Sequence, residues 1–229
     1  KCNFVQMTPT AWQLMRLAEW KGNPSLFAVS GGEKIDKDLF NWLSHASRRA
    51  FNCYGPTETT IYATAFSSES IAQIVTVGTP LPGYLAAITG KDGGFQPRES
   101  KGELVLAGKG IARGYLNAPE KERECFFRLP NGMPAYRTGD LAKISLSGEI
   151  QIFERIDSQV KLNGYRIELE EIENCLAKIL PTAKVVVVLM EDEQRKFLKA
   201  FIQPPPGIEV NENLHDRLRL LLPEYMIPA

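Results

Sequence analysis

The sequence predicts a mixed α/β protein with one structural regime in residues 1–156 and another in residues 157–229. Helix and strand patterns alternate in about the first 70 residues, which is typical of an α/β arrangement. Short strands separated by turns follow up to residue 155, and a helix beside two apolar strands comes after them. We therefore expect an α/β portion that continues into a β-rich portion, and then a small α+β unit.

The elements of the α/β portion can be placed from start signals and periodicity. Thr8 and Pro9 have the pattern of an N-cap and a first-turn proline, so a helix is expected to run to about Trp20. The strand, helix and strand that follow are expected at residues 25–30, 36–49 and 50–54.

The stretch YGPTETT, residues 54–60, has the composition of a shaped loop with ligand-binding groups. Gly55 and Pro56 exclude a helix or a central strand. The threonine hydroxyls and the Glu58 carboxylate offer oxygen ligands, and Tyr54 offers a flat ring. Such a set suits a nucleotide phosphate, its Mg²⁺ and an adenine.

The later elements follow from turn signals and periodicity. Asn163-Gly164 is a strong hairpin signal between two short strands. An amphipathic helix is expected over residues 168–180, because apolar residues recur there at helical spacing. The remaining strands are expected at 84–90, 102–108, 141–155 with a turn at Ser147-Gly148, 184–190 and 197–203, the last two paired, and a final helix at 214–222.

Composition narrows the class of protein. Hydrophobic residues are 44% and charged residues 24%, as in a globular domain. Basic and acidic residues balance at 27 each, so no global field favours nucleic acid or an acidic membrane surface. Four scattered cysteines without a C-x-x-C pair argue against a zinc site, and with the absence of a long apolar run or leader they indicate a cytoplasmic protein.

Five motifs occur in one order along the chain: NCYGPTE at 52–58, GELVLAGKGIARGYL at 102–116, YRTGDL at 136–141, RIDSQVKLNGYRIELEEIE at 155–173 and LPEYMIP at 222–228. This series resembles the adenylation domains of nonribosomal peptide synthetases, members of the adenylate-forming superfamily. The resemblance covers nearly the whole chain. It implies that residues 1–156 are the C-terminal part of a large subdomain with the substrate and ATP pocket, and that residues 157–229 are an incomplete, mobile C-terminal subdomain.

The resemblance also implies a reaction. An amino acid and ATP give an aminoacyl adenylate and pyrophosphate, and the acyl group then passes to the phosphopantetheine thiol of a carrier protein. ATP and Mg²⁺ are the implied cofactors, and the implied partners are the amino acid, a peptidyl carrier protein and neighbouring synthetase domains. Nucleic acid and membrane partners are not expected.

Roles for individual residues follow from the same resemblance. Glu58 is implied to hold Mg²⁺, Thr57 to contact the α-phosphate, and both to act with Lys161 as the catalytic set. Tyr54 is implied to stack on adenine. The residues implied to bind the nucleotide are Gly32, Asn52, Tyr54, Gly55, Thr57, Asp140, Ile152 and Arg155.

Three of the carried-over residues have simpler alternatives. Asp140 matches the family aspartate that accepts hydrogen bonds from both ribose hydroxyls, and the alternative is an exposed turn aspartate. Arg155 is implied to contact the ribose-phosphate region, or else forms a surface ion pair with Glu154. Asp157 matches the hinge of the mobile subdomain, and it could also cap the turn that follows it.

The substrate pocket is implied at six positions, none of them charged: Gln6, Val29, Gly31, Cys53, Ile61 and Tyr62. A neutral substrate side chain is therefore favoured, with Gln6 and Tyr62 as polar contacts. Gly31 leaves room for the substrate, whereas Tyr62 reduces it. For Cys53 the alternative is a small residue that fills the core.

The match is incomplete. The phosphate-gripping loop, the aspartate that anchors the substrate amine and the C-terminal lysine lie outside these 229 residues, so the fragment alone is expected to be inactive. Glu154, Ile152 and Asn163 replace a glycine, an aromatic residue and an arginine that the family prefers. Two functions remain as alternatives to an amino-acid-activating domain. One is a free-standing acyl or aryl acid ligase, and the other is a non-catalytic remnant or scaffold fragment.

Overall fold

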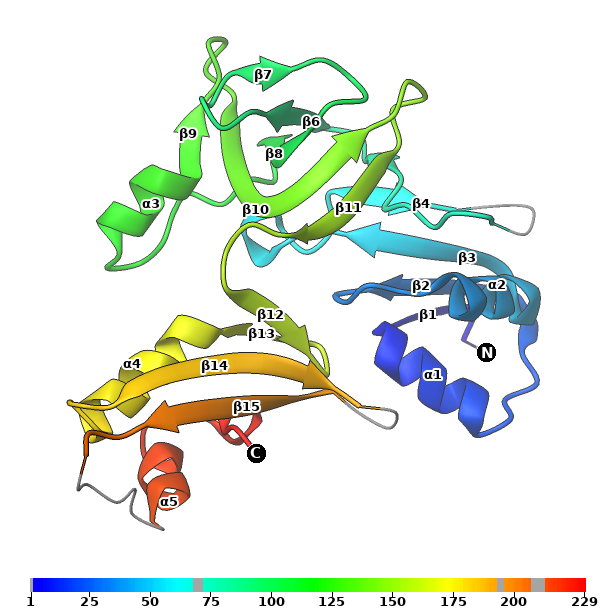
Figure 1. Ribbon diagram of the computed structural model, residues 1–229. Coiled ribbons are helices and arrows are strands. Elements are labelled where there is room, and N and C mark those ends of the chain that lie inside the picture. Colours follow the sequence, from blue (N-terminus) through cyan, green and yellow to red (C-terminus); the bar gives the residue numbers. More distant parts are fainter. Residues whose placement is uncertain (1, 68–71, 193–195, 207–212) are drawn as a thin grey trace. The chain divides into compact units, whose positions relative to one another are not determined.

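A computed structural model describes residues 2–67, 72–192, 196–206 and 213–229 (Figure 1). The chain divides into two compact units, Lys1–Ile156 and Asp157–Ala229. The mixed α/β fold class is confirmed, because the first unit holds two sheets with helices and the second is a small α+β unit.

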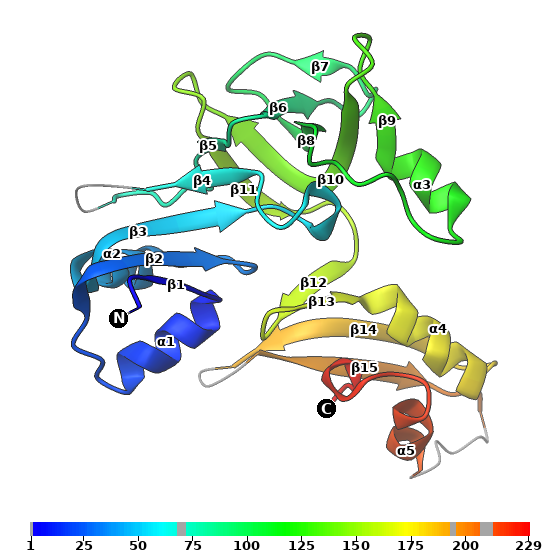
Figure 2. The same ribbon diagram turned by 180° about the vertical axis from the view of Figure 1, so that it is seen from behind.

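The first sheet of unit 1 has five strands in the order β1-β2-β3-β4-β5 (Figures 1 and 2). The first three strands are parallel, and the last two pair antiparallel to their neighbours. The strands are β1 (Phe4–Met7), β2 (Asn23–Gly31), β3 (Ser47–Tyr54), β4 (Thr64–Phe66) and β5 (Thr79–Pro80).

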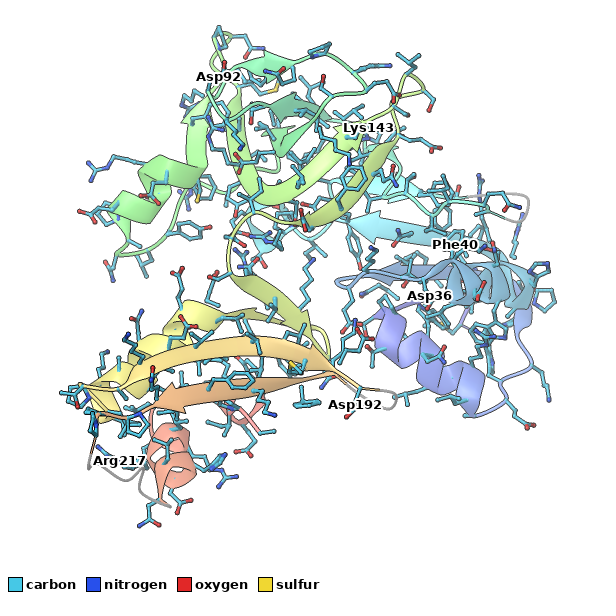
Figure 3. The ribbon with its side chains drawn as sticks, viewed as in Figure 1. Asp36, Phe40, Asp92, Lys143, Asp192 and Arg217 are labelled. Carbon is cyan, nitrogen blue, oxygen red and sulfur yellow. The ribbon has the colours of Figure 1, made fainter. Side chains whose placement is uncertain are left out.

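Helices α1 (Pro9–Leu17) and α2 (Lys37–Ala46) each follow an N-cap residue, and the cap at Thr8 is the one expected from the sequence. Thr8 Oγ1 accepts a hydrogen bond from the Ala11 amide, and Asp36 Oδ1 accepts one from the Leu39 amide. Figure 3 labels Asp36 at the start of α2 and Phe40 within it. The helices share one core with the sheet, which includes Trp12, Leu26, Ala28, Leu39, Phe40, Leu43 and Ala50.

Both helices end earlier than the sequence analysis expects. The helix expected to reach Trp20 ends at Leu17, because the backbone turns at Glu19, where φ is 54°. The helix expected over residues 36–49 ends at Ala46, since Ser47 already begins β3. Arg49 pairs with Phe27 of β2, so strand pairing takes these residues from the helix.

The second sheet of unit 1 is antiparallel, and it makes this part of the chain mostly β, as expected. Its main order is β11-β10-β8-β6-β7, and β9 pairs with the long strand β10. The expected turn at Ser147-Gly148 joins β10 to β11. The strands are β6 (Tyr84–Thr89), β7 (Phe95–Gln96), β8 (Lys101–Gly108), β9 (Phe126–Arg128), β10 (Pro134–Ile144) and β11 (Ile150–Arg155).

One helix of unit 1 has no counterpart in the sequence analysis. Helix α3 (Pro119–Cys125) has the sequence PEKEREC, whose charged residues give no apolar stripe for a periodicity argument. A separate core connects the two sheets of unit 1. It contains Tyr54 and Ala63 from the first sheet region and Leu104, Tyr136 and Ile150 from the second sheet.

In its described residues, unit 2 contains two antiparallel strand pairs, two α-helices and a short final turn. Asn163 and Gly164 have positive φ values of 52° and 84°, which suits the expected tight turn between β12 and β13. The expected pairing of the two apolar strands β14 and β15 is confirmed. The elements are β12 (Gln159–Leu162), β13 (Tyr165–Glu168), α4 (Leu169–Ile179), β14 (Lys184–Glu191), β15 (Lys196–Gln203), α5 (Leu214–Arg219) and the 3₁₀ turn η2 (Glu224–Met226).

The apolar face expected on α4 forms the centre of unit 2. Ile172 and Leu176 are fully buried against Val187 of β14 and Leu198 of β15. Helix α5 ends at Arg219, before the expected limit of residue 222. Among the described residues, no helix is long and apolar enough to cross a membrane.

We predict that Gly78→Ala destabilises unit 1 much more than Gly83→Ala. Both glycines have positive φ, 73° and 92°, so each alanine costs about 1–2 kcal/mol of backbone strain. A Cβ at Gly78 would also collide with the Ala65 carbonyl group, whereas nothing lies within 4 Å of one at Gly83. Thermal unfolding of both variants of the full-length protein measures the difference, and equal shifts would contradict the steric account.

Candidate functional site

Four of the predicted pocket residues share one face of the first sheet. Gln6 pairs with Val29, and Gly31 pairs with Cys53, in the parallel register of β1, β2 and β3. Val29 and Gly31 are two residues apart, so they lie on the same face. Ala28, on the opposite face, belongs to the core under α1 and α2. The carboxyl ends of parallel strands form the usual ligand edge of an α/β sheet.

The YGPTETT loop leaves β3 at this edge and returns toward the sheet. It contains the 3₁₀ turn η1 (Thr57–Thr59), and the residue directly after the loop, Ile61, has a φ of 71° that is rare for a β-branched residue. The Tyr62 amide donates to the Thr60 carbonyl at 2.9 Å, which closes a γ-turn around Ile61. The loop therefore holds a strained backbone directly before Tyr62.

Gly55 lets the loop fold back on itself. A Cβ there would lie 2.7 Å from the Ile61 carbonyl oxygen and 2.9 Å from the Tyr62 Cα. The Ala63 amide donates to the Tyr54 carbonyl at 2.9 Å and closes the base of the loop. Gly55 thus serves the shape of the predicted nucleotide loop, whether or not it also contacts the ligand.

Neighbouring segments hold the outer part of the loop. The Tyr84 hydroxyl donates to the Thr59 carbonyl at 2.7 Å, and the Thr60 hydroxyl donates to the Gly110 carbonyl at 2.7 Å. Thr57 remains exposed. Its hydroxyl is consequently placed where a phosphate could reach it.

Glu58, the predicted Mg²⁺ ligand, is buried in a hydrogen-bonded group. Its backbone carbonyl accepts from the Ala112 amide at 2.8 Å. Its Oε1 accepts from the Tyr115 hydroxyl at 2.5 Å, and the Tyr115 oxygen lies 3.3 Å from the Tyr136 hydroxyl. Burial, the hydrogen bond to Glu58 and the one to Tyr136 all raise the pKa of Tyr115, so it remains a neutral donor.

Asp140 lies in β10 and is only 6% exposed, so it is not an exposed turn aspartate. Its Oδ2 accepts a hydrogen bond from the Tyr54 hydroxyl, and its Oδ1 lies 3.2 Å from Arg155 Nη1. Arg155 also donates to the Thr138 carbonyl at 2.8 Å. Register explains the ion pair, because Asp140 and Arg155 are partners across β10 and β11.

Tyr54 is buried, and its hydroxyl remains protonated. Burial raises its pKa well above the ordinary value, and the Asp140 charge and hydrogen bond raise it further, against smaller opposing effects of Thr138 and Arg155. The ring belongs to the core that joins the two sheets. Tyr54 therefore has a structural role, and stacking on adenine stays a prediction for it.

The other predicted nucleotide residues of unit 1 have different surroundings. Asn52 is buried, and its amide donates to the Thr76 carbonyl at 2.8 Å, so the side chain supports the turn before β5. Gly32 is exposed with φ 90°. Ile152 packs beside the core that contains Tyr54. Contact of these three residues with a nucleotide stays a prediction.

Two predicted site residues belong to unit 2. Asp157 Oδ1 accepts a hydrogen bond from the Gln159 amide at 3.1 Å, so the expected turn cap is confirmed. Lys161 is an exposed residue of β12, opposite Arg166 in β13. The hinge role of Asp157 and the catalytic role of Lys161 stay predictions.

The pocket residues Cys53 and Tyr62 are neutral groups at physiological pH. Burial raises the pKa of the Cys53 thiol to about 11, so the residue is a poor nucleophile. Burial also raises the pKa of Tyr62, with a contribution from Cys53, while a hydrogen bond with the Gln6 side chain opposes the shift. These two side chains are thus uncharged, and a neutral substrate side chain stays a prediction.

The Glu58 carboxylate fits a Mg²⁺ ion that is bound mainly by phosphate oxygens. No group of three or more histidine, cysteine, aspartate or glutamate side chains gathers for a metal among the described residues. Mg²⁺ with a nucleotide commonly takes only one or two protein carboxylates, with phosphate and water oxygens completing the shell. Glu58 is suited to be that carboxylate.

A groove of about 430 Å³ lies in the β-rich part of unit 1, away from these residues. Leu85, Ile88 and Ile144 give it an apolar lining, with Gln96 and Arg98 at its side. None of the predicted site residues lines it.

Comparison with known proteins identifies the family. Residues 1–116 match the family described as AMP-binding enzyme, so the chain belongs to that family. Among curated relatives, bacitracin synthase 1 of Bacillus licheniformis is 40% identical over 203 residues, which are 87% of this chain and 4% of the relative. Zwittermicin A synthase ZmaJ of Bacillus cereus is 43% identical over 210 residues, which are 87% of this chain and 39% of the relative.

A solved structure supports the same assignment. The Vibrio cholerae adenylation domain AlmE, in complex with glycyl-adenosine-5'-phosphate, has a TM-score of 0.88 at 27% identity, over 99% of this chain and 45% of that one. The resemblance to adenylation domains of nonribosomal peptide synthetases is thereby confirmed, and the chain belongs to the family of adenylate-forming ligases. It spans less than half the length of each of these three proteins.

Several residues that support the site were not predicted from the sequence. Tyr84 binds the loop at Thr59, and Tyr115, which lies beside Tyr136, binds Glu58. Thr138 accepts a hydrogen bond from the Asp140 amide. None of these four residues was named as a site residue from the sequence. Tyr115 and Tyr136 do lie inside the quoted motifs GELVLAGKGIARGYL and YRTGDL. Their supporting role depends on contacts between segments far apart in the chain, and such contacts leave no local pattern in the sequence.

We predict that Tyr115→Phe loosens Glu58 without removing the ring. The variant deletes a hydrogen bond to a buried carboxylate, which costs about 1–3 kcal/mol. The cost should appear in thermal unfolding of the full-length protein. Tyr225→Phe, which changes an exposed tyrosine, is the matched control, and equal effects of the two substitutions would contradict the role of Tyr115.

Proposed function

We propose that the complete protein activates a neutral amino acid with ATP and transfers it to a carrier protein in nonribosomal peptide synthesis. The observation that carries the proposal is the placement of Glu58 and Asp140 around one loop. Glu58 lies inside the loop, and Asp140 binds Tyr54 at its start. Similarity to two synthases and to AlmE, whose complex contains a glycyl adenylate, supports the same reaction.

The chemistry requires cations and donors where two anions meet. A substrate carboxylate must attack the α-phosphorus of ATP, so charge has to be neutralised as the new bond forms. In the proposed arrangement, Glu58 holds Mg²⁺ and the exposed Thr57 hydroxyl contacts the α-phosphate. When bound, Mg²⁺ supplies charge neutralisation on the phosphate oxygens.

Asp140 and Arg155 are proposed to hold the ribose and the adjacent phosphate. Asp140 already accepts hydrogen bonds from Tyr54 and Arg155, but two carboxylate oxygens have about four acceptor positions. Acceptor capacity therefore remains for ribose hydroxyls. Arg155 is always charged, and its ion pair with Asp140 fixes the direction of the guanidinium.

The second half-reaction is proposed to involve unit 2. Asp157 is proposed as the hinge between the two units, and Lys161 as a catalytic residue brought by unit 2. The partner is proposed to be a carrier protein whose phosphopantetheine thiol attacks the adenylate. A cytoplasmic location is part of the same proposal.

The proposed function predicts a sharp loss of activity in two variants. Glu58→Gln and Asp140→Ala should each lower amino-acid-dependent ATP–pyrophosphate exchange of the full-length protein at least about 100-fold. Asp92→Ala, which changes an exposed aspartate in the turn between β6 and β7, is the control and should retain exchange.

Three results would change the proposal. Near-normal exchange in both variants would contradict the roles of Glu58 and Asp140. Exchange only with acids that lack an amine would assign the protein to the acyl or aryl acid ligases. No exchange from folded protein would favour a non-catalytic role.

A further inference from the structure

The ring of Tyr62 lies directly on the sheet face that carries the predicted pocket. A Cβ built on Gly31 would lie 2.6 Å from Tyr62 Cε1 and 2.7 Å from the Tyr62 hydroxyl oxygen. The Cys53 carbonyl oxygen would be 2.9 Å from the same point. The space that a glycine opens at position 31 is thus occupied by a phenol ring.

The hydroxyl end of the ring lies beside Gly31. The Tyr62 hydroxyl also lies near the side chain of Gln6, which belongs to β1 and lowers the pKa of Tyr62. Gln6 pairs with Val29, two residues before Gly31 on β2. The ring therefore starts from the loop after β3 and extends across β2 to β1, over the carboxyl ends of the strands.

The backbone that carries Tyr62 is held on both sides. The γ-turn around Ile61 precedes it, and the hydrogen bond from the Ala63 amide to the Tyr54 carbonyl follows it. Gly55 packs against the Tyr62 Cα, and there is no room for a side chain at position 55. Moving the ring aside would require a change in a tightly packed and strained turn.

From this geometry we infer that the pocket accepts an amino acid with no side chain or a very small one, and that Tyr62 sets this limit. The inference rests on the proposed function and narrows its substrate. A side chain longer than a methyl group would have to displace the ring from Gly31 and break its contact with Gln6. Because one misfitting methylene already changes discrimination about 10- to 200-fold, a leucine-sized side chain should be rejected at least about 100-fold.

The test is ATP–pyrophosphate exchange of the full-length protein with acids ranked by size. Glycine, alanine, valine, leucine and phenylalanine form one series, and glycolate, lactate and 2-hydroxyisocaproate form a second series without the amine. We expect kcat/KM for glycine or alanine to exceed that for leucine at least about 100-fold. Tyr62→Ala should raise kcat/KM for valine or leucine relative to glycine at least about 10-fold.

Tyr62→Phe is the matched variant, because it keeps the ring and removes only the hydroxyl group that meets Gln6. It should retain the wild-type size order. A wild-type protein that activates leucine or phenylalanine as well as glycine would overturn the inference. So would a folded Tyr62→Ala protein with an unchanged size order.

The two series separate this inference from the proposed function. Exchange with hydroxy acids but with no amino acid would contradict the proposed function, and the order of the three hydroxy acids would still decide the size limit. A preference for glycolate supports the limit, and equal use of all three overturns it. No exchange with any acid, from folded protein, contradicts both.

Discussion

The bond between Tyr54 and Asp140 is the contact on which the candidate site depends. It joins the end of a parallel strand in the first sheet to a strand of the second sheet, 86 positions later in the chain. Arg155 extends the connection by pairing with Asp140 across β10 and β11. Because all three groups are buried or half-buried, their bonds are little weakened by solvent. The start of the YGPTETT loop is consequently fixed relative to the β-rich part of unit 1.

The remaining features of the site follow from a loop fixed at its start. Gly55 allows the chain to fold back, η1 presents Thr57, and Glu58 turns inward to Tyr115. The strained turn then brings Tyr62 over the strand ends. The groups proposed to bind the nucleotide and the group proposed to limit the substrate thus come from one short segment, and a change in the loop should affect both proposed functions together.

Local signals in the sequence were sufficient for the cap at Thr8, the hairpin at Asn163-Gly164 and the apolar face of α4. These local signals gave the wrong structure where pairing with a distant strand determines the conformation. Arg49, for example, was expected in a helix but lies in β3, where it pairs with Phe27 of β2. The ordered motifs identified the family and the loop, and the sequence also indicated that Tyr62 reduces the room left by Gly31. It did not reveal Tyr115 or the Tyr54–Asp140 bond, because side-chain contacts between segments far apart in the chain leave no local pattern.

The most direct test of the account is amide hydrogen exchange across residues 54–63 in the Tyr54→Phe variant of the full-length protein. The variant keeps the buried ring and removes only the hydroxyl that binds Asp140. If the bond fixes the loop, the amides of Thr59, Thr60 and Ala63 should exchange at least about 5-fold faster than in the wild-type protein. Unchanged exchange in this segment would contradict the central role of the bond.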